Sequence, residues 1–306
     1  MRARSWAAVA VLVLAAGCES ETAAPVRASA NAAARLPAKA ARCVLTLPDA
    51  KAARAAKARL ERQVARYVGG KPGRIAYSAL DLVSGVSFGH REHERGMITA
   101  SGSKVDILMA LLARRKELRS GERDLATRMI RESDNHAADS LWWRAGGGAG
   151  LAAFYRKLGL RETTPGPGRY WGGTTTTPAD RVKLLQLLAE GGRGLRAADR
   201  GLVLALMGRV HRDQDWGVSA AARPGDRVAL KNGWTPRPFV RNTWAVTSYG
   251  RVTGPGRDLL LSVQTDHQPS EGHGIATIEG LAKIVGTRLG TLTPGRTRAC
   301  AAGPTA

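Results

Sequence analysis

The stretch Ser101-Gly102-Ser103-Lys104 stands directly before a strongly helical segment at residues 104–116. Lys104 follows Ser101 by three positions, and this spacing puts both side chains on one face of a helix. A serine hydroxyl is a weak nucleophile until a neighbouring group takes its proton. A lysine can do so when burial and positive neighbours lower its pKa. Taken alone, however, the tetrad is more typical of a solvent-exposed helix start with an ordinary lysine.

Two more short polar stretches follow, each in a definite local setting. Ser133-Asp134-Asn135 opens a predicted helix, and by itself it would be an ordinary helix cap. Lys231-Asn232-Gly233-Trp234 ends an apolar strand that begins near residue 228. Runs of β-branched and apolar residues at 243–249 and 259–265 predict two further strands after it.

Strand patterns occur near both ends of the chain, with helical patterns between them. Residues 74–89 alternate like two short strands around a turn, whereas residues 49–68 and 277–289 have helical spacing. Helical patterns also fill most of the region from 104 to 210. This order predicts one α/β unit whose helical lobe is inserted between two parts of a sheet, with the site at the seam between them.

In this order and setting, the three polar stretches resemble the S-x-x-K, S-D-N and K-T-G elements of class A β-lactamases and penicillin-binding proteins. The resemblance extends over roughly residues 45–295. It implies an α/β fold in which the N- and C-terminal segments form an antiparallel sheet flanked by helices. An all-α lobe would be inserted at about residues 104–215.

The resemblance implies a catalytic role for four residues. Ser101 would attack a β-lactam or peptide-like carbonyl and become acylated. Lys104 would take its proton, and Ser133 would relay a proton toward the leaving nitrogen. Lys231 would bind an anionic group of the substrate. The implied activity is that of a serine hydrolase or acyltransferase.

Other matched residues would hold the substrate. Asn135 would bind its amide side, and the backbone N–H of Trp234 would serve the oxyanion hole. Asn232 replaces the usual Thr or Ser beside Gly233 and keeps a hydrogen-bonding side chain. Arg241 would be a second carboxylate contact, although an exposed surface arginine fits this position equally well.

Two departures from the family pattern bear on turnover. The loop at residues 163–173 should contain the glutamate that activates water for deacylation, but it has no carboxylate. Glu162 lies several residues too early, and we expect it to be a surface residue. The segment between Lys104 and Ser133 is also shorter than in typical class A enzymes, so one cleft wall should be open. An acyl-enzyme should therefore persist, as in penicillin-binding proteins.

The N-terminus has the pattern of an export signal. Arg2 and Arg4 precede an apolar run at residues 6–16, which is too short to span a bilayer stably. Gly17-Cys18 follows directly and resembles a bacterial lipobox, of the type found in actinobacterial lipoproteins. We expect a lipid on Cys18 and a location at the outer face of the cell membrane. The alternative is plain secretion with an incidental cysteine.

These signals divide the chain into three parts, a signal peptide at residues 1–17, a flexible tether at 18–44 and a catalytic domain at 45–300. Cys43 and Cys300 lie at the two ends of the expected domain, and export permits disulfides. The resemblance places the first and last helices side by side, which makes a Cys43–Cys300 bridge plausible. Two free thiols are the competing interpretation.

The net charge of +22 and the pI near 11.1 do not point to nucleic acid. The basic residues are scattered, and no helix-turn-helix, zinc finger or aromatic stacking platform is visible. A basic surface would instead suit anionic envelope polymers or lipid headgroups. His90 and His93 lack a third ligand, so we expect no metal, and we also expect no cofactor.

The sequence thus predicts an exported, monomeric, lipid-anchored serine hydrolase or acyltransferase with weak deacylation. Its partners would be a β-lactam or peptidoglycan-like substrate and, through the lipid, the membrane. One alternative is a penicillin-binding protein like a D-alanyl-D-alanine peptidase. The other is a non-catalytic envelope binding protein that keeps the fold and the pocket. The natural substrate is not specified by the sequence.

Overall fold

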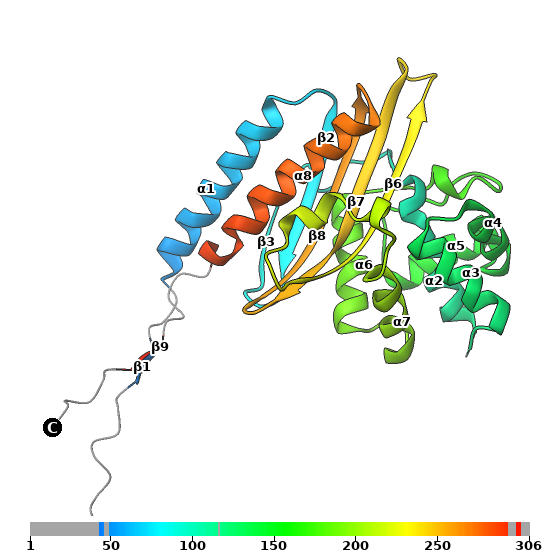
Figure 1. Cartoon of the computed structure of the whole chain (residues 1–306), viewed down its shortest axis with the longest axis horizontal. Coiled ribbons are helices and arrows are strands. Elements are labelled where there is room, and N and C mark those ends of the chain that lie inside the picture. The colour runs from blue at the N-terminus through cyan, green and yellow to red at the C-terminus, as the bar shows by residue number, and fades with distance from the viewer. Residues whose placement is uncertain (1–42, 46–48, 116, 293–297, 301–306) are drawn as a thin grey trace, which may run out of the picture. The chain divides into compact units, whose positions relative to one another are not determined.

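The computed structural model describes residues 43–45, 49–115, 117–292 and 298–300. A five-stranded antiparallel sheet of order β3-β2-β8-β7-β6 forms its centre (Figure 1). The strands are β2 (Arg74–Asp81), β3 (Val86–His90), β6 (Arg227–Arg237), β7 (Thr243–Gly254) and β8 (Arg257–Gln268). Because β2 from the N-terminal part pairs with β8 from the C-terminal part, the predicted α/β fold is confirmed.

Two long helices, α1 (Ala50–Gly69) and α8 (Glu271–Arg288), cover one face of the sheet (Figure 1). The Asp49 side chain starts α1 by accepting hydrogen bonds from two backbone N–H groups of its first turn. The Tyr67 hydroxyl lies 3.2 Å from the carbonyl oxygens of Ala276 and Thr277. The first and last long helices therefore pack side by side, as the resemblance implied.

The opposite face of the sheet carries the helical lobe (Figure 1). Its helices are α2 (Ser103–Arg114), α3 (Ser120–Arg131), α4 (Asn135–Arg144), α5 (Gly147–Leu158), α6 (Pro178–Glu190) and α7 (Ala197–Met207). Helix α2 is buried at every position from Ser103 to Leu112, so it is the central helix of this lobe. Strand β8 alternates between two cores: Leu260 packs with the lobe, while Leu259 and Leu261 pack with α1 and α8.

One local prediction was wrong. Strand β6 does not end with residues 231–234 but continues to Arg237, and its pairing with β7 is unbroken from Arg227 onward. Its polar residues stay in the strand because β7 supplies their backbone partners, and β6 is an edge strand, which tolerates Pro236. Helix α4 ends at Arg144, just before the glycines at 146–148, and the left-handed Gly146 (φ 98°) then starts α5.

Contacts divide the chain into two units, residues 45–298 and residues 1–44 with 299–306. Strands β1 (Cys43–Leu45) and β9 (Arg298–Cys300) form a small two-stranded sheet. The side chains of Cys43 and Cys300 lie outside the described part of the structure, so the disulfide stays a prediction. The signal peptide, Cys18 and most of the tether are also outside it. Within the described residues, no helix is long and apolar enough to cross a bilayer.

Candidate active site

Ser101 and Lys104 meet at the start of α2. A 3₁₀ turn at Ala100–Gly102 carries Ser101 and runs directly into this helix. The Lys104 Nζ lies 2.9 Å from the Ser101 Oγ, as the three-residue spacing predicted. The Tyr249 hydroxyl donates to the Gly102 carbonyl at 2.8 Å, which fixes this turn to strand β7. Ser101 and Lys104 are therefore held by both the helical lobe and the sheet.

Ser133 brings the loop between α3 and α4 to the same lysine. Its Oγ lies 3.0 Å from the Lys104 Nζ, and the Asn135 Oδ1 lies 2.8 Å from it. Ser133 has a left-handed backbone (φ 59°), which is strained for a serine and is often found where function fixes a side chain. Asp134 caps α4 by accepting from the Ala137 N–H at 3.0 Å, as a structural residue would.

Lys231 reaches the same hydroxyl from the sheet. Its Nζ lies 3.0 Å from the Ser133 Oγ, so Ser133 is contacted by both lysines. Lys231 and Lys104 are both fully buried. Ser133 and Lys231 are 98 positions apart along the chain, and the three motifs thus converge on one polar cluster.

Burial also sets the protonation of the two amines. Burial lowers the pKa of Lys104 from 10.5 to about 7, although the negative charges of Asp134 and Asp139 act to raise it. Burial, together with the like charge of Lys104, holds the pKa of Lys231 well below its usual value. Lys104 can therefore be neutral near pH 7, which is the state needed to accept a proton from Ser101.

Gly233 lets strand β6 approach the nucleophile closely. A Cβ at this position would stand 2.9 Å from the Ser101 backbone nitrogen and 2.2 Å from the Thr99 carbonyl oxygen. Only glycine leaves room for this contact. The next residue, Trp234, lines the pocket beside Ser101. The requirement for glycine in the third motif is thus a packing requirement of the turn that carries Ser101.

Two residues predicted to bind substrate are not brought to the pocket. Asn232 is fully buried, and its Nδ2 donates to the backbone oxygens of Gln214 and Trp216 at 2.8 and 3.0 Å. These contacts fasten β6 to the segment that precedes it in the chain. Arg241 lies in the exposed turn between β6 and β7, away from the residues that line the pocket.

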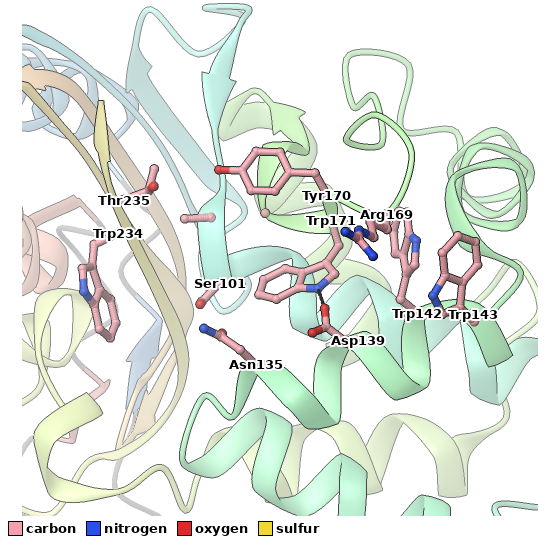
Figure 2. Close-up of a pocket in the computed structure, with 12 residues that line it drawn as sticks. Ser101, Asn135, Asp139, Trp142, Trp143, Arg169, Tyr170, Trp171, Trp234 and Thr235 are labelled. Carbon is pink, nitrogen blue, oxygen red and sulfur yellow. Dashed lines mark hydrogen bonds between the residues drawn. The ribbon is translucent and has the colours of Figure 1, made fainter. Parts of the chain in front are cut away.

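A cavity of about 570 Å³ opens beside Ser101 (Figure 2). Strand β6 and the nucleophile turn form one wall, and helix α4 with the loop before α6 forms the other. It is lined by Ala100, Ser101, Asn135, Asp139, Trp142, Trp143, Arg169, Tyr170, Trp171, Gly172, Trp234 and Thr235. The far wall is rich in aromatic residues, which sequence reasoning missed. The signal was present in the crowding of tryptophan and tyrosine at 142–143 and 170–171.

The loop before α6 brings no carboxylate to Lys104. Trp171 covers the lysine instead, with its ring centre 4.8 Å from the Nζ. The Glu162 carboxylate contacts other residues instead. Its Oε2 lies 2.8 Å from the His93 Nδ1 and accepts a hydrogen bond from the Thr177 Oγ1 at 3.0 Å. Glu162 is not among the residues lining the pocket. Among the described residues, no cluster of His, Cys, Asp and Glu is arranged to hold a metal ion.

A comparison with protein families agrees with this geometry. The model of the beta-lactamase enzyme family matches residues 117–289, which is more than half of the chain. The chain belongs to this family. The match begins after Ser101, so the inclusion of Ser101 in the candidate site rests on the geometry described above and not on the family match.

Relatives of this beta-lactamase family member include proteins whose name describes a lipoprotein. The "Putative lipoprotein LppW" of Mycobacterium tuberculosis is 26% identical over 217 residues, which are 67% of each chain. A protein of the same name from Mycobacterium bovis matches equally well.

Solved structures share the fold. A beta-lactamase from Xanthomonas campestris superposes with a TM-score of 0.65 at 23% identity, covering 76% of this chain and 98% of the other. The class A beta-lactamase from Mycobacterium abscessus gives 0.65 at 24%, covering 76% and 99%. The structure of PBP-A gives 0.65 at 20%, covering 81% and 99%. These likenesses establish the architecture of this family member.

Proposed function

We propose that the protein is an exported serine hydrolase or acyltransferase that forms an acyl-enzyme at Ser101. The observation that carries the proposal is the polar cluster in which Lys104 Nζ lies 2.9 Å from the Ser101 hydroxyl and 3.0 Å from that of Ser133. Membership in the beta-lactamase family supports the substrate class, a β-lactam or a peptide-like amide.

Acylation would use the cluster as follows. Neutral Lys104 takes the proton of Ser101 while its oxygen forms a bond to the substrate carbonyl carbon. The carbon–nitrogen bond then breaks, and Ser133 passes a proton to the leaving nitrogen. Ser133 can be resupplied from either lysine, because both amines lie 3.0 Å from its oxygen.

Binding would use the groups around this centre. The backbone N–H groups of Ser101 and Trp234 would face the oxyanion, a role supported by the tight approach at Gly233. Asn135 would contact the amide side of the substrate. An anionic group near Lys231 would favour its charged form, which burial otherwise disfavours.

The loop before α6 favours a second candidate, a penicillin-binding protein like a D-alanyl-D-alanine peptidase. Because no carboxylate of this loop approaches Lys104, water would lack a general base after acylation. The acyl-enzyme would then be long-lived with β-lactams, and the natural carbonyl substrate would be peptide-like. Export and lipid attachment at Cys18 are supported by the lipoprotein name of the relatives.

The proposal is tested by incubating the purified protein with a fluorescent penicillin and measuring intact mass over time. We expect one adduct on Ser101, absent in Ser101→Ala and unaffected in Ser140→Ala, an exposed serine of α4. Lys104→Ala should lower the acylation rate by roughly 10²-fold or more, as expected for loss of a general base.

Three outcomes separate the candidates. A stable adduct supports the peptidase-like candidate, whereas rapid loss of the adduct with hydrolysis of nitrocefin supports a β-lactamase. No adduct at high penicillin concentration would contradict acylation at Ser101 and favour a binding protein without catalysis.

A further inference from the structure

Trp171 closes the side of Lys104 that the catalytic partners leave open. Ser101, Ser133 and Asn135 contact the Nζ from the nucleophile turn and from the start of α4. The indole ring of Trp171 lies over the same atom, 4.8 Å from centre to nitrogen. Lys104 is consequently fully buried although it stands beside an open cavity. Figure 2 shows this ring in the cavity, between Ser101 and the far aromatic wall.

Asp139 holds the ring in this position. The Trp171 Nε1 donates a hydrogen bond to the Asp139 Oδ1 at 2.8 Å (Figure 2). Asp139 lies one helical turn after Asn135 on α4, so the same face of the helix carries both residues. The indole N–H is its single polar group and is directed to Asp139, so the ring presents only an apolar face to Lys104.

The loop that carries Trp171 is itself tightly closed. Thr164 and Thr175 exchange backbone hydrogen bonds across its base, and the Trp171 carbonyl accepts from both the N–H and the hydroxyl of Thr174. A side chain at Gly166 would meet the Tyr170 carbonyl oxygen at 1.9 Å, so the chain packs against itself here. The ring is thus placed by a defined backbone and by its hydrogen bond to α4.

We propose that Trp171, positioned by Asp139, is a lid that keeps water away from the acyl group on Ser101. This inference rests on the proposed acyl-enzyme. In hydrolysis, a water oxygen would bond to the acyl carbon, the bond from that carbon to the Ser101 Oγ would break, and a water proton would go to this oxygen. The attacking water needs a polar partner near Lys104. The indole fills that space and offers no acceptor.

The test measures the lifetime of the penicillin adduct by intact mass after removal of free penicillin. Trp171→Ala and Asp139→Ala should each shorten the lifetime by roughly tenfold or more, equivalent to about 1.4 kcal/mol of barrier. Asp139→Asn keeps an oxygen acceptor for the indole and should retain the lifetime of the unaltered protein. Ser140→Ala on α4 and Phe239→Ala in the exposed β6–β7 turn are matched controls that should also retain it.

Two combined variants separate water exclusion from other effects. In Trp171→Phe the ring loses its hydrogen bond, so adding Asp139→Ala should shorten the lifetime no further. In Trp171→Ala the freed Asp139 could itself activate water, so the double variant Trp171→Ala/Asp139→Ala is decisive. A fast loss of the adduct in this double variant supports the lid, whereas a return to the original lifetime overturns it.

The outcomes distinguish this inference from the proposed function. If the unaltered protein forms an adduct whose lifetime does not change in Trp171→Ala or Asp139→Ala, the lid is wrong and acylation at Ser101 stands. If the unaltered protein loses its adduct within seconds, the lid is also wrong. If no adduct forms at all, the proposed function fails and the lid fails with it.

Discussion

Lys104 owes its chemistry to its surroundings. Its amine is buried among the hydroxyls of Ser101 and Ser133, the amide oxygen of Asn135 and the face of Trp171. Burial penalises the charged form and lowers its pKa to about 7. An exposed lysine at the same place would stay protonated and could not act as a base. The packing that buries the amine is therefore what would let Lys104 act as the proposed base.

The pH dependence of acylation follows from this shift. In the proposed mechanism the base is the neutral amine of Lys104, so the first-order acylation rate at saturating penicillin should rise as pH increases through about 7 and level off above it. We expect this in stopped-flow measurements between pH 5.5 and 8.5. A rate that is flat over this range, or that rises only near pH 10, would remove Lys104 from the role of base.

At the scale of elements, a buried ion pair fixes α2 behind the site. Arg181 on α6 donates to the Asp106 Oδ1 at 2.6 Å, and both side chains are fully buried. The Tyr155 hydroxyl on α5 donates to the other carboxylate oxygen at 2.7 Å. Asp106 follows Lys104 by two positions, so these contacts join three helices directly behind the turn that carries Ser101.

Removing one partner of this pair should be costly. Asp106→Ala leaves the Arg181 guanidinium buried without its carboxylate, and we expect the free energy of unfolding to fall by about 3–5 kcal/mol. Urea denaturation followed by circular dichroism measures the change. The matched control is Glu61→Ala, which breaks the half-exposed Lys57–Glu61 pair on α1 and should cost about 1 kcal/mol or less. If the free energy of unfolding falls equally in the two variants, the buried pair stabilises the fold no more than the exposed pair does.

At the scale of the whole molecule, the dominant feature is charge. Lysines and arginines number 47 against 25 acidic residues, so even complete pairing would leave a large positive excess. Several arginines are paired locally; Arg74 and Arg237, for example, both contact the buried Asp266. The excess positive charges repel one another in the folded protein, and this repulsion lowers the free energy of unfolding.

Salt should therefore stabilise the protein. The screening length falls from about 30 Å at 0.01 M to about 8 Å at 0.15 M ionic strength, which weakens long-range repulsion more than contact pairs. We therefore expect the Tm to rise when sodium chloride is increased from about 0.01 to about 0.15 M. Each kcal/mol by which screening raises the free energy of unfolding should raise the Tm by about 2–4 °C. Calorimetry measures it, with sucrose of equal osmolality as the uncharged control. A Tm that falls with salt would mean that local ion pairs outweigh the net charge.

The sequence determined the order and type of the elements. Alternating and helical spacings record which side of each segment is buried, and this information is local. It was therefore enough to predict the sheet built from both ends, the helical lobe between them and the Ser101–Lys104 pair within a single turn. It misjudged the extent of β6, whose polar end is retained by pairing with β7.

Only the tertiary structure decided which distant residues meet. Ser133 and Lys231 are 98 positions apart and Asp139 and Trp171 are 32 apart, yet each pair is within hydrogen-bond distance. It also directed Asn232 into the protein and left Arg241 in an exposed turn. Such contacts depend on how completed helices and strands pack together, and no periodicity along the chain encodes them. Packing thus placed an indole over the Lys104 amine in this chain.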